Sequence, residues 1–402
     1  MTTDQKLPLR GLRVIDCATL FAGPFIATTM GDFGAEVIKV EQPGKGDDLR
    51  RLGFSKDGYG LWWAYGARNK RSVSLNLRVP EGQELLRQLA KTADVLVENF
   101  RPGTMERWNL GWETLHELNP RLVMVRVTGF GQTGPYSHRA GFGTLAEAMS
   151  GFAHMNGEAD GPPILPAFAM ADAIAGLHGC YGVMYALWER NVNGGTGQYL
   201  DVSLLEPIFS FLGPQISTYD QTGFIQGRTG NRLPFSVPRN AYKTKDDKWV
   251  ALSASAQSIF ERVCVGIGRP ELIADERFKN MQARIENADE IEEIVGNWMR
   301  QHTRDEVLTR FEEVEAALAP VYDVSEFAAD PHVQARGTIV RVPDPQLGTI
   351  AMQNALPYLS TTPGQVRTTG PHTVGEHTDQ VLSEWLGYGA AQIERLRQSG
   401  VV

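Results

Sequence analysis

Short apolar runs alternate with amphipathic segments over the first 130 residues of this chain. The apolar runs at 12–17, 36–41, 72–77, 95–99 and 122–128 predict strands. The intervening segments predict helices, one ending near Phe33, one over 80–93 with Pro80 in its first turn, and one over 111–119. Strands at this spacing, joined by helical crossovers, predict an α/β fold with a parallel, doubly wound sheet.

The pattern changes in the second half of the chain. Helical periodicity at 145–155, 173–190 and 204–219 is followed by a Gly- and Arg-rich stretch, 221–240, that predicts a linker. A strand at 248–253 and helices at 258–267, 286–302 and 304–316 predict a smaller α+β domain over 241–329. Strands at 338–342 and 349–352, then helices at 375–385 and 391–399, complete the chain. We therefore expect one large domain built from 1–220 and 330–402, containing both termini.

Composition narrows the function classes. The 402 residues are 42% hydrophobic and 21% charged, which is ordinary for a soluble protein, and the net charge of -8 argues against general nucleic-acid binding. No signal-peptide core and no membrane-spanning run is visible. Cys17, Cys180 and Cys264 are far apart without a CxxC pair, so we expect free thiols, a cytoplasmic location and no metal site.

A strand–helix–strand start raises the question of dinucleotide binding. The first turn, Cys17–Phe25, contains a single glycine followed by proline, so no GxGxxG motif can be drawn. Glu41 ends the second predicted strand, where a ribose-binding acid would stand, but without the glycine motif the pattern favours an acid at a strand end and turn. We do not expect NAD binding.

One acid, Asp172, stands alone in the Ala- and Gly-rich segment 166–187, where a long helix is predicted to begin. Asp is among the best helix N-cap residues, which gives a structural role. A carboxylate at a helix N-terminus also stays ionised, as a nucleophile must, which gives a chemical role. Glycines at 176, 179 and 182 would let another helix or a ligand approach closely. Both roles remain open on the pattern alone.

Two further groups are candidates for ligand binding. The basic residues of 68–71, together with Arg78, predict either a local anion site or a solvated turn. Asn99, Phe100 and Arg101 follow a predicted strand, at the sheet edge where ligands of open parallel sheets bind.

Several short segments, in this order and spacing, resemble the family III CoA-transferases, a group that includes formyl-CoA transferase and carnitine CoA-transferase and is related to the 2-methylacyl-CoA racemases. The resemblance covers almost the whole chain. It is carried by LRVID at 12–16, AGP at 22–24, GAEVIKVE at 34–41, NKRS at 69–72, VENF at 97–100, GFGQTGP at 129–135, the segment around Asp172, and GEHT at 375–378.

The resemblance implies a Rossmann-like large domain and ring-shaped subunits in an interlocked homodimer. It implies that Asp172 is the nucleophile of a CoA transfer that passes through an aspartyl anhydride and an aspartyl-CoA thioester. Coenzyme A would then be a substrate, with no permanently bound cofactor. The implied CoA contacts are Leu20, Phe21, Ala22, Leu75, Arg78, Asn99, Phe100, Arg101 and Arg107.

Three departures from the family pattern concern the site. Gln42 replaces an adenine-side arginine, Gly143 replaces an acidic neighbour of the nucleophile, and the glycine-rich flap of formyl-CoA transferase has no clear match. The catalytic histidine of the racemases aligns with Phe142, which cannot carry a proton. Racemisation and an inactive CoA-binding protein therefore remain as the alternatives to transfer.

The substrates are less well defined by the sequence. Succinyl-CoA as donor, with a small carboxylic or dicarboxylic acid as acceptor, is the expectation drawn from dicarboxylate-handling members. Arg228, Arg232 and Arg239 would either hold a distal carboxylate or belong to a solvated loop.

Overall fold

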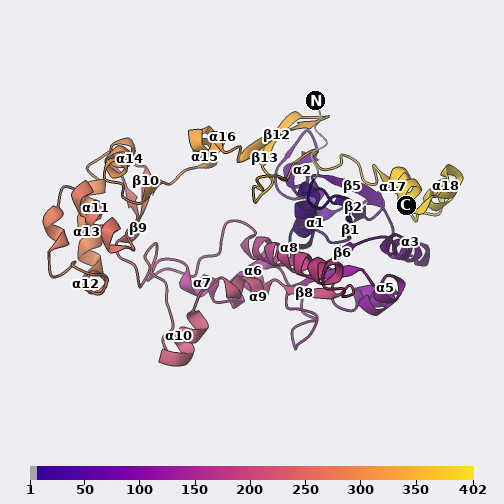
Figure 1. The fold of residues 1–402 in the computed structure, drawn as a ribbon, viewed down its shortest axis with the longest axis horizontal. Coiled ribbons are helices and arrows are strands. Elements are labelled where there is room, and N and C mark those ends of the chain that lie inside the picture. Colours follow the sequence, from indigo (N-terminus) through magenta and orange to yellow (C-terminus); the bar gives the residue numbers. More distant parts are fainter. Residues whose placement is uncertain (1–6) are drawn as a thin grey trace. The chain divides into compact units, whose positions relative to one another are not determined.

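A parallel sheet of six strands organises the larger of two units in the computed structural model, which describes residues 7–402 (Figure 1). The strands lie in the order β5-β2-β1-β6-β7-β8, which is 3-2-1-4-5-6 along the sheet. Their bounds are β1 (Arg13–Asp16), β2 (Glu36–Glu41), β5 (Lys70–Ser74), β6 (Val95–Glu98), β7 (Val123–Thr128) and β8 (Tyr199–Ser203). This is the order of dinucleotide-binding folds, and the predicted doubly wound α/β sheet is confirmed.

Helices cover both faces of the sheet because successive strand residues point to opposite sides. Ile15, Leu96 and Met124 pack under one layer of helices, whereas the neighbouring Val14 and Val95 pack under the other. The first layer contains α3 (Pro80–Ala90), α5 (Trp112–Leu118), α17 (Thr378–Leu386) and α18 (Ala390–Gln398). The second contains α1 (Ala22–Asp32), α6 (Gly143–Met149), α8 (Met170–Asn191) and α9 (Leu205–Ser210).

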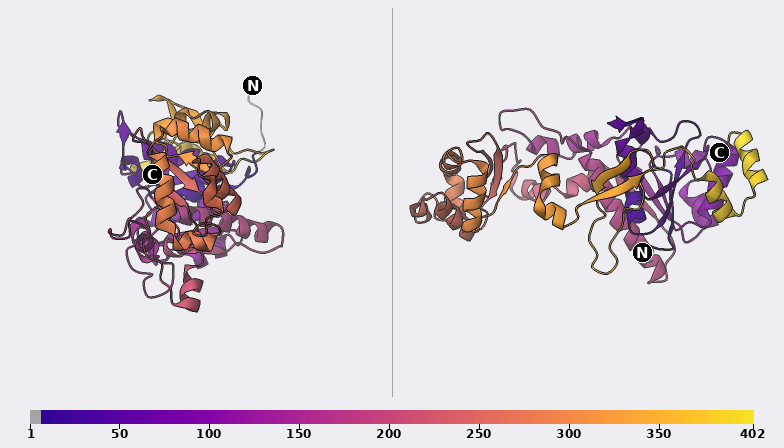
Figure 2. Two further views of the ribbon diagram at one scale, coloured as in Figure 1. Left: turned by 90° about the vertical axis from the view of Figure 1, so that its left-hand side faces the viewer. Right: turned by 90° about the horizontal axis from the view of Figure 1, so that it is seen from above.

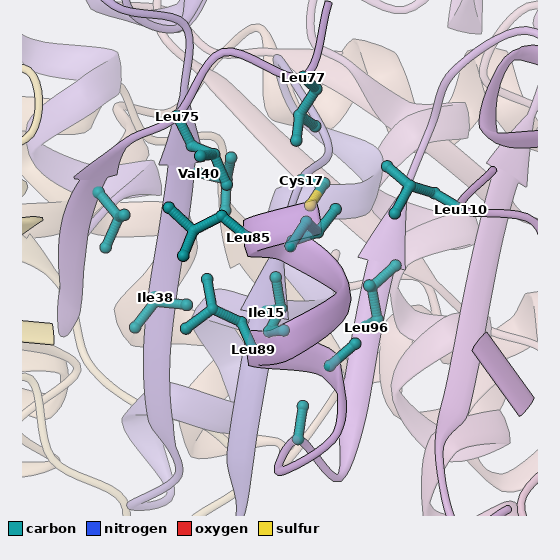
Figure 3. Packing of buried hydrophobic residues seen from close by; sticks show 14 of the residues in the cluster. Ile15, Cys17, Ile38, Val40, Leu75, Leu77, Leu85, Leu89, Leu96 and Leu110 are labelled. Carbon is teal, nitrogen blue, oxygen red and sulfur yellow. The ribbon is translucent and has the colours of Figure 1, made fainter. Parts of the chain in front are cut away.

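Figure 3 shows the packing of the first layer from close by. Leu85 and Leu89 of α3 point at the strand residues Ile15, Ile38 and Leu96. The helix predicted over 80–93 is confirmed for 80–90, and because leucines four apart lie on one face of a helix, these two side chains reach the sheet together.

Glycines allow α8 to lie unusually close to its neighbours. A Cβ built on Gly179 would stand 2.2 Å from Cδ1 of Ile26 on α1, and one on Gly176 would stand 2.6 Å from Cδ1 of Phe25. Gly182 approaches Leu200 of β8 in the same way. The close neighbours of this glycine stripe are therefore a helix and a strand, not a ligand.

Smaller elements complete the larger unit. The hairpin of β12 (Ile339–Asp344) and β13 (Gly348–Gln353) is antiparallel and confirms both strands predicted near the C-terminus. The remaining elements are a short 3-10 helix (Asp48–Arg51), β3 (Ser55–Lys56), β4 (Tyr59–Gly60), α2 (Leu61–Gly66) and α4 (Thr104–Arg107).

The second unit consists of residues 153–164 and 214–333. Its antiparallel sheet has the order β11-β10-β9, built from β9 (Arg239–Lys243), β10 (Trp249–Ser253) and β11 (Leu318–Pro320). Helices α11 (Gln257–Gly266), α12 (Met281–Glu286), α13 (Ala288–Met299) and α14 (Arg304–Glu313) pack with this sheet around Phe260, Phe278 and Phe311. The orange helices of this unit can be followed from two further directions in Figure 2.

Two predicted helices are each divided. The segment 204–219 forms α9 and α10 (Gln215–Thr222), because Gly213 and Pro214 interrupt it. The segment 145–155 forms the end of α6 and the short α7 (Phe152–Met155), with Gly151 at φ 95° between them. Helices α15 (Val324–Ala329) and α16 (Pro331–Ala335) lie before the chain returns to the larger unit. Within residues 7–402, no helix combines the length and the apolar character that a bilayer crossing requires.

Candidate active site

The strand order reverses between β1 and β6, and ligands of such sheets bind in the crevice outside the carboxyl ends of the strands at that point. The segments that leave β1 and β6 are joined there by one side chain. The amide oxygen of Asn99 accepts from the Thr19 N–H at 2.8 Å, and its Nδ2 donates to the Thr19 carbonyl at 2.8 Å. This two-way bond fixes both walls of the crevice.

A buried network of charges holds the loop after β1. Leu20 adopts φ 64°, rare for a residue with a side chain, and its N–H donates to Oδ1 of Asp47 at 3.2 Å. Lys39 pairs with Asp47 at 2.8 Å and donates to the Ala18 carbonyl. Burial alone would raise the pKa of Asp47, but the Lys39 charge and hydrogen bond lower it, so Asp47 remains an anion that orders the loop.

A cavity of about 280 Å³ opens at this point and contains most of the predicted site residues. Its walls include Leu20, Phe21, Ala22, Asn99, Phe100, Arg101 and Asp172. The structure therefore brings the predicted nucleophile to residues from two distant segments, the loop after β1 and the loop after β6.

Asp172 is the third residue of α8, not its N-cap. The helix begins at Met170 and its cap is Ala169, which has no side-chain acceptor, so the N-cap prediction is wrong. The carboxylate accepts from its own backbone N–H, and no cation among the described residues pairs with it. Burial, and then the negative charge of Glu147, raise the pKa of Asp172 to about 6. A half-buried carboxylate that pairs with no cation among the described residues has the character of a chemical group rather than a structural one.

Gly143 leaves the space that the Asp172 carboxylate occupies. A Cβ built on Gly143 would stand 2.2 Å from Oδ2 of Asp172, so a larger residue is excluded while the carboxylate keeps this position. The departure at 143 thus has a steric meaning. A second close contact shapes the same wall, since a Cβ on Gly129 would lie 2.4 Å from Cα of Gly141.

A second cavity, of about 200 Å³, contains Leu75, Arg78 and Phe100. Phe100 lines both cavities, and Gln42 and Lys45 also line the second. Arg107, the remaining predicted contact, lines neither cavity and donates to Oγ1 of Thr104 at 2.8 Å.

The basic cluster at 68–71 is neither an anion site nor a solvated turn. Arg68 is buried against Asp32 at 2.7 Å, and Lys70 is buried against Asp16 at 2.8 Å. Arg71 pairs with Glu36 and Glu384. These three cations neutralise acids of the fold, which leaves only Arg78 of the cluster at a cavity.

The other groups with open alternatives also have protein partners. Glu41 is buried and accepts from Arg50 at 2.7 Å and from the Asp47 N–H at 2.9 Å, which is the role of an acid at a turn. In the second unit, Arg232 pairs with Asp289, and Arg239 donates to the Asn231 carbonyl. Arg228 donates to the His154 carbonyl at 3.4 Å.

Arg139 is a cavity residue that the sequence did not reveal. It lines the Asp172 cavity from the loop between β7 and α6, and its guanidinium lies 3.7 Å from the ring centroid of Tyr136. Its place in the chain could have indicated this role, because Arg139 lies in the loop that follows the carboxyl end of a predicted strand, as residues 99–101 do.

Comparison with known proteins shows the family of this chain. The model of CoA-transferase family III matches residues 9–378. Two proteins of Chloroflexus aurantiacus are similar over nearly their full length: succinyl-CoA–D-citramalate CoA-transferase, 42% identical over 98% of both chains, and the succinyl-CoA–L-malate CoA-transferase beta subunit, 44% identical over 100% of this chain and 99% of its own. A CAIB/BAIF family protein from Brucella suis has a TM-score of 0.83 at 32% identity, over 95% of this chain and 100% of that one. This chain belongs to CoA-transferase family III.

Proposed function

We propose that the protein transfers CoA from succinyl-CoA to a small dicarboxylic acid, with Asp172 as the covalent nucleophile. The observation that carries the proposal is the Asp172 carboxylate, which lies without a cation partner in the cavity at the strand-order reversal. At neutral pH, a carboxyl group with a pKa of about 6 is mostly ionised and yet more basic than a solvated aspartate. Both properties favour nucleophilic attack.

The reaction proceeds through two carboxyl derivatives of Asp172. The carboxylate attacks the donor thioester carbonyl and forms a C–O bond to the acyl carbon, the C–S bond breaks, and the products are an aspartyl–acyl anhydride and the CoA thiolate. The thiolate then attacks the aspartyl carbonyl, which expels the donor acid and leaves an aspartyl-CoA thioester. The acceptor carboxylate reverses these steps and restores Asp172. Because a thioester is exchanged for a thioester, the energy is conserved between substrate and product.

The two cavities suggest how an acyl-CoA would lie. We assign the acyl thioester to the cavity of Asp172 and the nucleotide part of CoA to the cavity of Arg78, with Phe100 at their junction. We propose that Arg101, which follows Phe100 at this junction, reaches from the Asp172 cavity to the pyrophosphate, since guanidinium groups bind phosphate oxygens well. Arg107 is retained as a proposed contact at the outer end of the path.

The dicarboxylate preference has two supports. Two similar proteins are named for succinyl-CoA with citramalate or malate. Arg139 lines the Asp172 cavity and is available to a second carboxylate. We expect Arg139→Gln to raise KM for dicarboxylates about tenfold while KM for a monocarboxylate of equal length changes little. A screen of donor thioesters against free acids, read by mass spectrometry of the CoA products, defines the pair.

The nucleophile is tested by substitution and by trapping. Asp172→Asn and Asp172→Ala should abolish exchange while the circular dichroism spectrum and the melting transition remain those of a folded protein. Wild-type enzyme quenched during turnover and digested should yield a CoA adduct on the peptide that contains Asp172. Wild-type turnover by either variant would refute the role of Asp172. Phe142, which lines the cavity, has no proton to exchange, so deuterium wash-in on a 2-methylacyl-CoA should be absent.

We also propose the interlocked homodimer of ring-shaped subunits that the family resemblance implies. Exposed aromatic residues along α8, among them Tyr181, Tyr185 and Trp188, support a large interface in the assembly. Light scattering coupled to gel filtration should give twice the mass of one chain.

The three free cysteines support a reducing, cytoplasmic location.

A further inference from the structure

Glu147 is a buried acid that stands beside the proposed nucleophile from another helix. It lies on α6, four residues after Gly143, so both residues face the same side of that helix. Gly143 abuts the Asp172 carboxylate, whereas the Glu147 carboxylate accepts from the Ala171 N–H at 3.2 Å. Glu147 is only 3% exposed, so its side chain is enclosed where α6 meets the first turn of α8.

The hydrogen bond from Ala171 supplies what the sequence of α8 lacks. The first N–H groups of a helix have no partner within the helix, and a side chain at the N-cap usually accepts one of them. Here the N-cap is Ala169, which cannot do so. Glu147 therefore provides the cap from α6, at the residue that directly precedes Asp172.

The charge of Glu147 acts on Asp172 as well. Burial of the Asp172 carboxyl group, and then the negative charge of Glu147, raise the pKa of Asp172 to about 6. Arg101 and Arg139 line the same cavity. Ionisable groups on the other elements packed against α8 are engaged elsewhere: Asp32 with Arg68, Arg126 with Glu98 and Glu106, Asp201 with the Gln132 N–H, and Glu206 with Ser203.

We propose that Glu147 is a positioning residue of the transfer reaction, one that caps α8 from α6 and makes the Asp172 carboxylate more nucleophilic by charge repulsion. The proposal rests on the proposed role of Asp172. Acylation converts the Asp172 anion into a neutral anhydride or thioester, so repulsion from Glu147 is present before attack and relieved after it. Burying the Glu147 carboxylate costs folding free energy. Its repulsion of Asp172, which ends on acylation, would favour the attack step and so explains why the charge is there.

Two substitutions separate the cap from the charge. Glu147→Gln keeps an acceptor oxygen for Ala171 but removes the charge, so the melting temperature should not fall and the acidic limb of kcat/KM should move to lower pH. Glu147→Ala removes both, and kcat should fall about 10- to 100-fold through misplacement of Asp172. Glu189→Gln, an exposed acid near the other end of α8, is the matched control and should change neither. An unmoved acidic limb in Glu147→Gln, or a kcat within twofold of wild type in Glu147→Ala, would overturn the proposal.

A double-mutant cycle tests the pair without relying on catalysis. Unfolding by denaturant at pH 7.5 is compared for Glu147→Gln, Asp172→Asn and the double variant. If the two carboxylates repel each other, removing either charge should raise the free energy of unfolding. Removing the other charge afterwards should raise it less, so the two effects are not additive. Additive effects would overturn the coupling even if Asp172 is the nucleophile. Coupling together with full exchange by Asp172→Asn would instead refute the proposed function.

Discussion

At the scale of single residues, the position of the Asp172 carboxylate depends on what surrounds it more than on its own identity. The sequence singled out this acid correctly as the unusual one in its segment. It did not indicate that Ala169 would be the N-cap, because the first residue of a helix depends on which backbone groups find partners in the fold. The family resemblance marked position 143 as a neighbour of the nucleophile, but the sequence did not show that the Asp172 carboxylate would occupy the space left by the missing side chain.

Gly143→Ala tests the steric role of this glycine. The added methyl group would stand 2.2 Å from Oδ2 of Asp172, so the carboxylate must rotate away. We expect kcat to fall about 100-fold, the cost of misplacing a reacting group by about 1 Å, with the fold retained. Gly389→Ala, where the new methyl group meets nothing within 4 Å, is the matched control and should keep full activity.

The pKa of Asp172 predicts opposite pH trends for activity and stability. Only the anion attacks, so kcat/KM should fall about tenfold per pH unit well below pH 6 and level off above pH 7. CoA binding measured by calorimetry over the same range separates this limb from ligand titration. A pH-independent kcat/KM between 5 and 7 would contradict the assignment.

Stability should change in the other direction. The folded-state pKa of about 6 lies above 3.8, the ordinary value for an aspartate, so this group's contribution to stability is complete below pH 4 and is lost as the pH rises through 6. Asp172→Asn should therefore be more stable than wild type at pH 7.5, by about 1–2 kcal/mol, and equal to it near pH 4. Denaturant unfolding at both pH values measures the difference.

At the scale of elements, the packing of α8 on α1 decides where the nucleophile stands. The sequence pattern predicted a helix over 173–190 with three glycines on it. It left open whether another helix or a ligand would approach these glycines. The structure assigns that place to α1 for Gly176 and Gly179. The spacing of the glycines indicates a helix face without bulky side chains. Which element packs on that face depends on the chain topology.

Gly179→Val should weaken this packing. Its Cβ would lie 2.2 Å from Cδ1 of Ile26, which overpacks the interface and costs about 1–3 kcal/mol. Adding Ile26→Ala should return part of the loss by making room, although alone it creates a cavity. Melting temperatures of the two single variants and the double variant measure the effect, and a Gly179→Val protein as stable as wild type would contradict this account.

At the scale of the whole molecule, net charge and local charge differ in sign. The chain carries -8, yet Arg101, Arg139, Arg78 and Lys45 line the two cavities. The three acids at the second cavity are paired within the fold: Glu41 with Arg50, Asp47 with Lys39, and Asp48 with Arg51 and Lys45. An anionic acyl-CoA would therefore meet a positive path on an acidic protein.

Salt should weaken acyl-CoA binding accordingly. We expect KM for the thioester to rise several-fold between about 20 mM and 300 mM salt, because screening shortens the reach of exposed charges. Arg78→Gln should raise KM at low salt and flatten this dependence. Arg262→Gln, which removes an exposed charge paired with Glu315 in the second unit, should leave the dependence unchanged.

The sequence by itself determined the α/β sheet, nearly all of its strands, the family and the unusual character of Asp172, because these follow from local periodicity and from short segments in a fixed order. Of the six strands in this sheet, only β8 was not predicted, because apolar and polar residues alternate weakly over Tyr199–Ser203 and three of its residues are not buried. Tertiary structure alone decided that the cations of 68–71 neutralise Asp32, Asp16 and Glu36, that Arg139 lines the Asp172 cavity, and that Glu147 caps the helix that carries Asp172. Ion pairs, steric contacts and shared cavities join residues that are far apart along the chain. The pattern within one segment does not determine how close that segment lies to another in the folded protein.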